Sequence, residues 1–99
     1  MRVTVADAVL DQIVRAAARG VEGIEVAAPG SVRLGSGRKP DPVEARAHER
    51  KLYLVVYARA EDEDRGGRAV PVLAERVREA VRACTGMMVG DVRVELLED

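Results

Sequence analysis

Apolar and polar residues alternate along this chain with two different periods, one helical and one extended. In residues 5–19 the apolar positions recur every three or four residues, which is the spacing of one helix face. Gly20 follows this run, and a glycine there favours the left-handed conformation that closes many helices. The pattern predicts an amphipathic helix whose apolar stripe is formed by Val9, Leu10, Ile13, Val14 and Ala17.

Residues 21–42 show no sustained period. Glycines and prolines recur throughout this stretch and interrupt every apolar run. We expect a connector that is flexible near residues 29–42, in which only Ser31–Leu34 is a candidate for a short extended piece.

Two strands are predicted after this connector. Residues 43–48 alternate between apolar and polar, which is the pattern of a strand with one buried face. Glu49 and Arg50 lie at the expected turn, although neither is a preferred hairpin residue. Residues 51–60 are apolar on both faces, so this strand should be central in its sheet or covered on both sides. One face carries Leu52, Leu54 and Val56, and the other carries Tyr53, Val55 and Tyr57.

A second amphipathic helix is predicted over residues 69–84. The acidic run and two glycines before it read as a flexible, solvent-exposed loop over residues 61–68. Pro71 then falls in the first turn of the helix, where its missing N–H costs little. Thr85 and Gly86 should end the helix. Its apolar stripe comprises Leu73, Val77, Ala80, Val81 and Cys84.

The last element is an alternating strand over residues 91–97. The full order is then helix, strand, strand, helix, strand, within one small domain of 99 residues. The economical arrangement is an α+β fold with both helices packed on one face of a three-stranded mixed sheet. The second helix forms a crossover if the strands on either side of it are parallel.

Composition narrows the classes of function. The 16 basic and 17 acidic side chains balance, whereas nucleic-acid-binding proteins usually carry a basic surplus and more aromatic rings than Tyr53 and Tyr57. A single cysteine excludes an internal disulfide and is typical of a reducing cytosol. No run approaches the roughly 20 apolar residues of a membrane span, and no signal-peptide pattern opens the chain. We therefore expect a cytoplasmic protein with no direct membrane span that binds no nucleic acid.

The sequence offers no recognisable catalytic constellation. Cys84 lies on a helix stripe, where an inert buried thiol is expected, and the only histidine, His48, is too distant in sequence to be identified as its base. A metal site at His48 would need companion ligands. The acidic run Glu61–Asp64 lacks the alternating ligands of a calcium loop. We expect no enzyme activity, no cofactor and no bound metal.

Two binding surfaces remain as candidates. The segment GSGRKPDP resembles a fragment of an anion-binding loop, but its glycine fingerprint is incomplete and Pro40 prevents a helix from following. Its basic side chains could instead contact an anion or a protein partner. The apolar stripe on the second strand is either core or an exposed surface for self-association or a partner. The loop candidates are Arg33, Arg38 and Lys39, and the strand candidates are Tyr53, Val55 and Tyr57.

Three segments carry a resemblance to a known family. Val21, Gly23 and Ile24 follow the first helix, and a glycine-rich basic connector precedes two strands, the second strongly hydrophobic. The most specific segment is a V-x-x-x-V helix that ends in Thr-Gly before a strand of alternating valines. It is formed by Val77, Val81, Thr85, Gly86, Val92 and Val94. Together these segments resemble the alkaline shock protein family of bacterial envelope stress-response proteins.

This resemblance implies a function in binding rather than in catalysis. It implies a non-enzymatic cytoplasmic protein of envelope homeostasis that self-associates into a scaffold. The implied partner is a protein, such as a small integral-membrane anchor. The alternative is a regulatory binding module that acts on a metabolic enzyme, such as one of fatty-acid synthesis.

Overall fold

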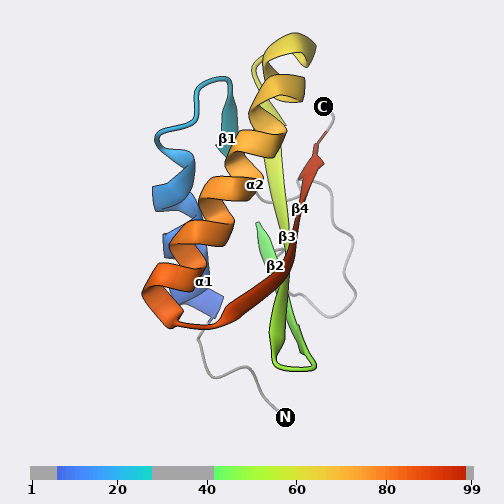
Figure 1. Cartoon of the computed structure of the whole chain (residues 1–99). Helices are drawn as coiled ribbons and strands as arrows, with labels where there is room; N and C mark the ends of the chain where they lie inside the picture. Colours follow the sequence, from blue (N-terminus) through green and yellow to red (C-terminus); the bar gives the residue numbers. More distant parts are fainter. Residues whose placement is uncertain (1–6, 28–41, 98–99) are drawn as a thin grey trace, which may run out of the picture.

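The computed structural model describes residues 7–27 and 42–97 of the chain. Within these residues, two helices and four strands form an α+β fold in which both helices lie on the same side of one sheet (Figure 1). The α+β class is therefore as predicted, whereas the sheet has four strands rather than three. The elements are α1 (Asp7–Ala18), β1 (Ile24–Val26), β2 (Val43–His48), β3 (Lys51–Ala60), α2 (Glu63–Thr85) and β4 (Met88–Leu96).

Strand β3 is the centre of the sheet. β2 pairs with it antiparallel along one edge, and β4 pairs with it parallel along the other, so the sheet is mixed. Helix α2 connects the two parallel strands as a crossover. The predicted turn between β2 and β3 is also present, at Glu49 and Arg50. Both turn residues have positive φ, 50° and 68°, which lets the chain reverse within two residues.

The unpredicted strand β1 lies on the same edge of β3 as β2. Ala58 shows this arrangement, because it pairs with Val26 of β1 and with Leu96 of β4 on opposite sides. The backbone N–H of Ala27 donates to the carbonyl of Tyr57 at 3.0 Å, and the N–H of Tyr57 donates to the carbonyl of Pro42 at 2.8 Å. The chain thus leaves this edge of β3 at Ala27 and returns to it at Pro42, and both residues hydrogen-bond to the backbone of Tyr57. Of the flexible connector expected near residues 29–42, residues 29–41 lie outside the described residues. The candidate extended piece Ser31–Leu34 lies among them.

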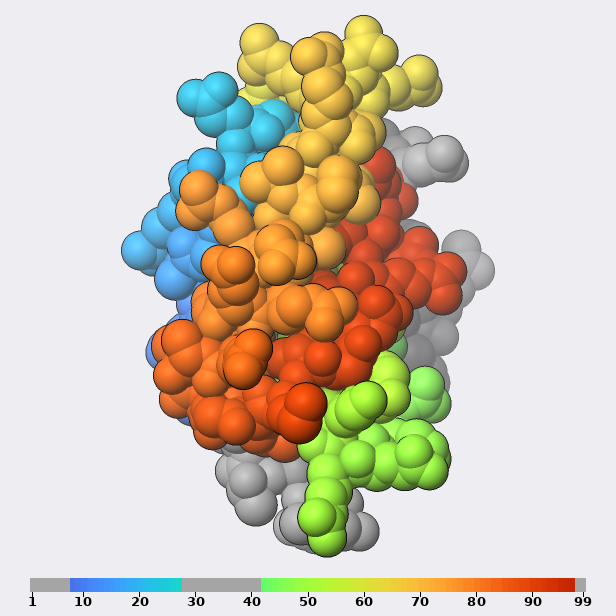
Figure 2. Space-filling view, viewed as in Figure 1, coloured from blue at the N-terminus to red at the C-terminus, as the bar shows by residue number. Residues whose placement is uncertain are grey.

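The hydrophobic core lies between the sheet and the helices. Figure 2 shows the helix side of the molecule, where α2 crosses the front, α1 lies beside it and the β2–β3 hairpin projects beyond both. Each fully buried aliphatic side chain here contributes about 1.5–3 kcal/mol to folding. Val9, which was expected in the stripe of α1, is 45% exposed and lies outside the core. The largest fully buried side chains are Leu10, Val14, Leu52, Leu54, Val56, Leu73, Val77 and Val81.

The prediction of a loop over residues 61–68 was wrong, because α2 begins at Glu63. The side chain of Asp62 caps the helix by accepting from the backbone N–H of Arg65 at 2.7 Å. The acidic residues that suggested a loop occupy the first turn, where they interact favourably with the helix dipole. Pro71 consequently lies inside the helix rather than in its first turn.

The two glycines that also suggested a loop have different surroundings. A Cβ on Gly66 would collide with the Cβ of Ala60, so this glycine lets α2 approach β3 closely. A Cβ on Gly67 would meet no atom within 4 Å. A glycine required by close helix–strand packing is therefore indistinguishable, in sequence, from a glycine in a loop.

The predicted end of α2 is confirmed. Gly86 adopts the left-handed conformation with φ 73°, and its N–H donates to the carbonyl of Arg82 at 2.9 Å. Thr85 Oγ1 donates to the carbonyl of Val81 at 2.6 Å and accepts from the N–H of Met87 at 3.1 Å. After α1, in contrast, it is Gly23 rather than Gly20 that has positive φ.

Cys84 does not close the buried stripe of α2. The expectation of a buried thiol was wrong, because Cys84 is exposed. Val81 is the last buried residue of the helix, so the core ends one turn before the helix does. Within the described residues, no helix is both long enough and apolar enough to cross a membrane.

Candidate functional site: the open face of the sheet

The sheet face opposite the helices carries side chains that no described helix or strand covers. Residues of β3 alternate, so burial of Leu52, Leu54 and Val56 beneath the helices directs their neighbours to this opposite face. Cross-strand pairs lie on one face, which adds residues of β2 and β4. We call this set the open face: Glu44, Arg46, Tyr53, Val55, Tyr57, Asp91, Arg93 and Glu95.

The sequence candidates form the centre of the open face. The structure brings Tyr53, Val55 and Tyr57 together on the middle strand, and all three are partly buried. Tyrosine and valine in this position combine an apolar body with a polar edge, as protein interfaces often do. The sequence left open whether this stripe is core or an exposed surface. In the structure these residues lie on the sheet face away from the core.

Charged side chains flank this centre in opposed pairs. Arg46 and Asp91 lie on either side of Tyr53, and Glu44 and Arg93 lie on either side of Val55. The sign of the charge thus reverses across β3 in both rows. Sequence reasoning missed these residues as part of a site. Their alternation within β2 and β4 was visible, but the pairing register that brings them together was not.

Two of the flanking residues interact within the chain. The hydroxyl of Tyr57 donates to Glu44 Oε2 at 3.0 Å, and Arg93 Nε lies 2.6 Å from Glu95 Oε1. The hydrogen bond to Glu44 raises the pKa of Tyr57 above 10.0, and burial and the charges of Glu44 and Glu95 add to this. Arg93 opposes the increase in pKa. Tyr57 therefore stays protonated and donates to a carboxylate at the rim.

Arg46 and Asp91 are different. Both residues are exposed, and neither side chain has a hydrogen bond or ion pair with any partner in residues 7–27 or 42–97. Their strands lie on opposite sides of β3, so the two backbones are about 9–10 Å apart, twice the spacing of adjacent strands. Tyr53 is thus bordered on the open face by a cation and an anion whose side chains have no partner among the described residues.

A β-bulge at Gly90 fixes which residues of β4 reach the open face. Leu52 pairs with Val89 but Tyr53 pairs with Asp91, so Gly90 is an extra residue in β4. The bulge directs Asp91 to the open face and the next residue, Val92, to the core. A Cβ at Gly90 would lie 2.6 Å from Cζ of Tyr53, so the tyrosine ring packs over the glycine backbone.

The other sequence candidates do not assemble into a site. Arg33, Arg38 and Lys39 lie outside the described residues. His48 ends β2, with its ring 6.4 Å from that of Tyr53, whereas Cys84 lies in the last turn of α2. The described part of the chain contains no group of three side chains suited to holding a metal ion.

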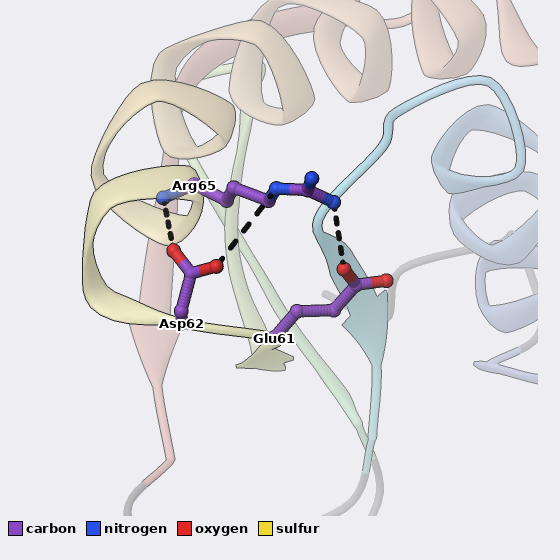
Figure 3. A network of polar contacts seen from close by, with 3 residues as sticks. All are labelled: Glu61, Asp62 and Arg65. Carbon is purple, nitrogen blue, oxygen red and sulfur yellow. Dashed lines mark hydrogen bonds and ion pairs between the residues drawn. The ribbon is translucent and has the colours of Figure 1, made fainter.

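A hollow lies where β1 and β3 meet the start of α2. Its volume is about 670 Å³, and its lining includes Gly23, Arg59, Glu61 and Arg65. Arg65 Nη1 donates to Glu61 Oε2 at 3.0 Å, and Arg65 Nε lies 3.8 Å from Asp62 Oδ2 (Figure 3). The charged groups that Figure 3 draws are thus paired with one another across the first turn of α2, so they are engaged in capping and anchoring this helix.

The open face contains the strand candidates Tyr53, Val55 and Tyr57. No protein-family model, curated protein or solved structure matches this chain. The open face combines an aromatic and aliphatic centre, charges of both signs beside it, and one cationic and one anionic side chain without a partner in the described chain.

Proposed function

We propose that this chain is a non-catalytic interaction protein that associates through its open face. The observation that carries the proposal is the one-sided cover of β3. Helices α1 and α2 bury Leu52, Leu54 and Val56, while Val55 in the middle of the opposite face has no described element over it. An apolar centre rimmed by polar residues is the usual composition of a protein–protein interface.

The chemistry of the centre supports binding to protein. Tyrosine contributes a large contact area with few rotatable bonds, which keeps the entropy cost of association low. Its hydroxyl also tolerates water while the face is free. The rim charges would then select the partner and its orientation, because like charges placed opposite each other disfavour the wrong arrangement.

The resemblance to alkaline shock proteins supports a more specific form of the proposal. In this form the chain acts in the cytoplasm as a scaffold of envelope homeostasis, self-associates and binds a membrane-anchored protein. The alternative form is a regulatory module that binds a metabolic enzyme. Both forms require a binding surface, and both are tested first at the open face.

The test replaces the central valine of the face. Val55→Arg introduces a charge into the apolar centre, and Val72→Arg is the matched control because Val72 is 48% exposed on α2, on the helix side of the molecule. We expect Val55→Arg to abolish both self-association in sedimentation equilibrium and protein contacts in crosslinked co-purification, while Val72→Arg preserves them. Circular dichroism should show that both variants fold. Equal binding by both variants would contradict the proposal.

A further inference from the structure

The charges of the open face are complementary to themselves in one orientation, and we infer from this that the face binds a second copy of the chain. The two copies lie face to face with their β3 strands running in the same direction, related by a two-fold axis parallel to β3. This inference rests on the proposed function, since it names the partner of the same surface.

The complementarity follows from the position of β3 between the two charged strands. A two-fold rotation about an axis parallel to β3 places β2 of one copy over β4 of the other, row by row. Arg46 then faces Asp91 of the second copy, and Glu44 faces Arg93 of the second copy. Each pair occurs twice by symmetry. The apolar centre meets its own copy at Val55.

The opposite alignment brings like charges together. A two-fold axis within the sheet plane but perpendicular to β3 places β2 over β2 and β4 over β4. Glu44 would face its own copy, Arg93 would face its own copy, and Asp91 would face Glu95. Like-charge contacts at an interface disfavour the arrangement strongly. The charge pattern therefore selects one of the two face-to-face orientations.

The dimensions of packed sheets allow the favourable pairs to form. Sheets pack about 10 Å apart, and an arginine and a carboxylate extending from opposite faces span this gap. The usual crossing angle of about 30° leaves the rows near Val55 in register and separates the ends of the strands. Lys51 and Arg59 lie at the two ends of this face of β3 and would each be opposite their own copy, so the crossing angle moves both like-charged pairs apart.

The pair of Arg46 and Asp91 should determine the specificity. Neither side chain has a polar partner within the described part of its own chain, so pairing between copies breaks no polar side-chain contact there. Glu44 and Arg93 already contact Tyr57 and Glu95, and moving them to a second copy would weaken those contacts. The Arg46–Asp91 pair is the one that a charge-exchange experiment isolates.

The experiment uses two single variants of the full chain, Arg46→Asp and Asp91→Arg. Each alone places like charges opposite each other twice, and we expect the dissociation constant of the dimer to rise about 100-fold or more. An equimolar mixture should form heterodimers, because one copy then carries two acids and the other two arginines at these positions. The double variant should form homodimers again. Glu79→Arg on the exposed side of α2 is the control, and it should dimerise like the wild type.

Native mass spectrometry and sedimentation velocity distinguish the outcomes. Recovery of dimers in the mixture supports the inference, since a folding defect in either variant would not be repaired by the other. If the wild type dimerises and Val55→Arg does not, but the mixture stays monomeric, the inferred orientation is wrong and the proposed function survives. A wild type that remains monomeric while its open face binds another protein also overturns the inference alone. Dimers that survive Val55→Arg overturn both the inferred dimer and the proposed function.

Discussion

The two faces of β3 are composed of similar residues but have different roles. Leu52, Leu54 and Val56 are at most 2% exposed beneath the helices, whereas Tyr53, Val55 and Tyr57 are partly exposed on the other side. The difference lies in the neighbouring strands. On the covered face β2 and β4 continue the apolar layer with residues such as Ala45 and Val92, and on the open face they contribute charges.

This contrast teaches that a strand's own sequence does not decide how its two faces are used. Val55 and Val56 are adjacent and chemically identical, yet one pairs laterally with Glu44 and Arg93 and the other with Val43 and Val94. An apolar strand face surrounded by apolar neighbours is core. An apolar strand face surrounded by charges of both signs has the composition of an interface.

The largest expected effect separates the two valines directly. Val56→Ala removes two methyl groups from a fully buried site and should lower the free energy of unfolding by about 2–3 kcal/mol, through lost burial and the cavity left behind. Val55→Ala should lower it by less than about 1 kcal/mol. Urea denaturation of dilute protein measures both values. Equal losses for the two variants would remove the distinction between the faces.

The next effect extends the comparison to the adjacent glycines of α2. Gly66→Ala should destabilise by about 1 kcal/mol, because the collision with Ala60 outweighs the gain in helix propensity. Gly67→Ala meets no neighbouring atom and should stabilise by up to about 1 kcal/mol. Thermal and urea unfolding of the pair measure the difference. Stabilisation by both substitutions would show that α2 does not approach β3 as closely as described.

A smaller effect on stability is expected at Gly90, on the open face. Gly90→Ala should push the ring of Tyr53 away from the backbone that it covers, at a cost below about 1 kcal/mol, since the tip of a side chain can move. The same substitution should weaken association, because the centre of the open face changes shape. Sedimentation and the nuclear magnetic resonance signals of Tyr53 measure these effects. Unchanged ring signals would contradict the described packing.

The smallest effect concerns the proton of Tyr57. Its pKa is raised above 10.0 in the folded chain, first by the hydrogen bond to Glu44, so the folded state holds this proton more tightly than the unfolded state does. The resulting stability is fully present below pH 10.0 and is lost as the pH rises through the raised pKa. Tyr57→Phe should therefore be less stable than the wild type near neutral pH, by no more than about 1 kcal/mol.

This difference between wild type and Tyr57→Phe should shrink as the pH increases. Urea unfolding at about pH 8 and about pH 11 measures the trend. Tyr53→Phe leaves Tyr57 as the only tyrosine, so its titration can be followed by ultraviolet absorbance. A midpoint at or below 10.0 would show that the hydrogen bond to Glu44 does not persist in solution.

The elements that the sequence predicts correctly are those with enough residues to show a period. The stripes of α1 and α2 and the alternation of β2 and β4 each span several repeats, and the apolar run of β3 is ten residues long. Strand β1 has only three residues, and its hydrogen bonds go to a part of β3 that is more than thirty positions away along the chain. No local pattern identifies such a strand, so the fourth strand was missed.

The errors at α2 have a related cause. The acidic start and the two glycines are local signals of a loop, and only the contact between Gly66 and Ala60 explains a glycine inside the helix. Cys84 has the correct helical spacing for burial, but no residue of the helix after Val81 is buried. Spacing predicts the direction in which a side chain points, whereas burial also requires an element opposite it.

The open face was predictable only in its centre. Tyr53, Val55 and Tyr57 share one face by simple alternation. The opposition of Arg46 to Asp91 depends on the register of two different strand pairs, and the bulge at Gly90 shifts one of them by a residue. The charge pattern that selects a partner therefore appears only when the strands are assembled.

The most direct test of the account follows the methyl signals of Val55 and Val56 by nuclear magnetic resonance while the protein is diluted. If the open face binds a second copy, the Val55 methyl signals change with concentration, whereas those of Val56 in the core and of Val72 on α2 stay constant. Changes at Val72 with none at Val55 would place the association on the helix side. Either that result or constant signals at all three valines would contradict the account.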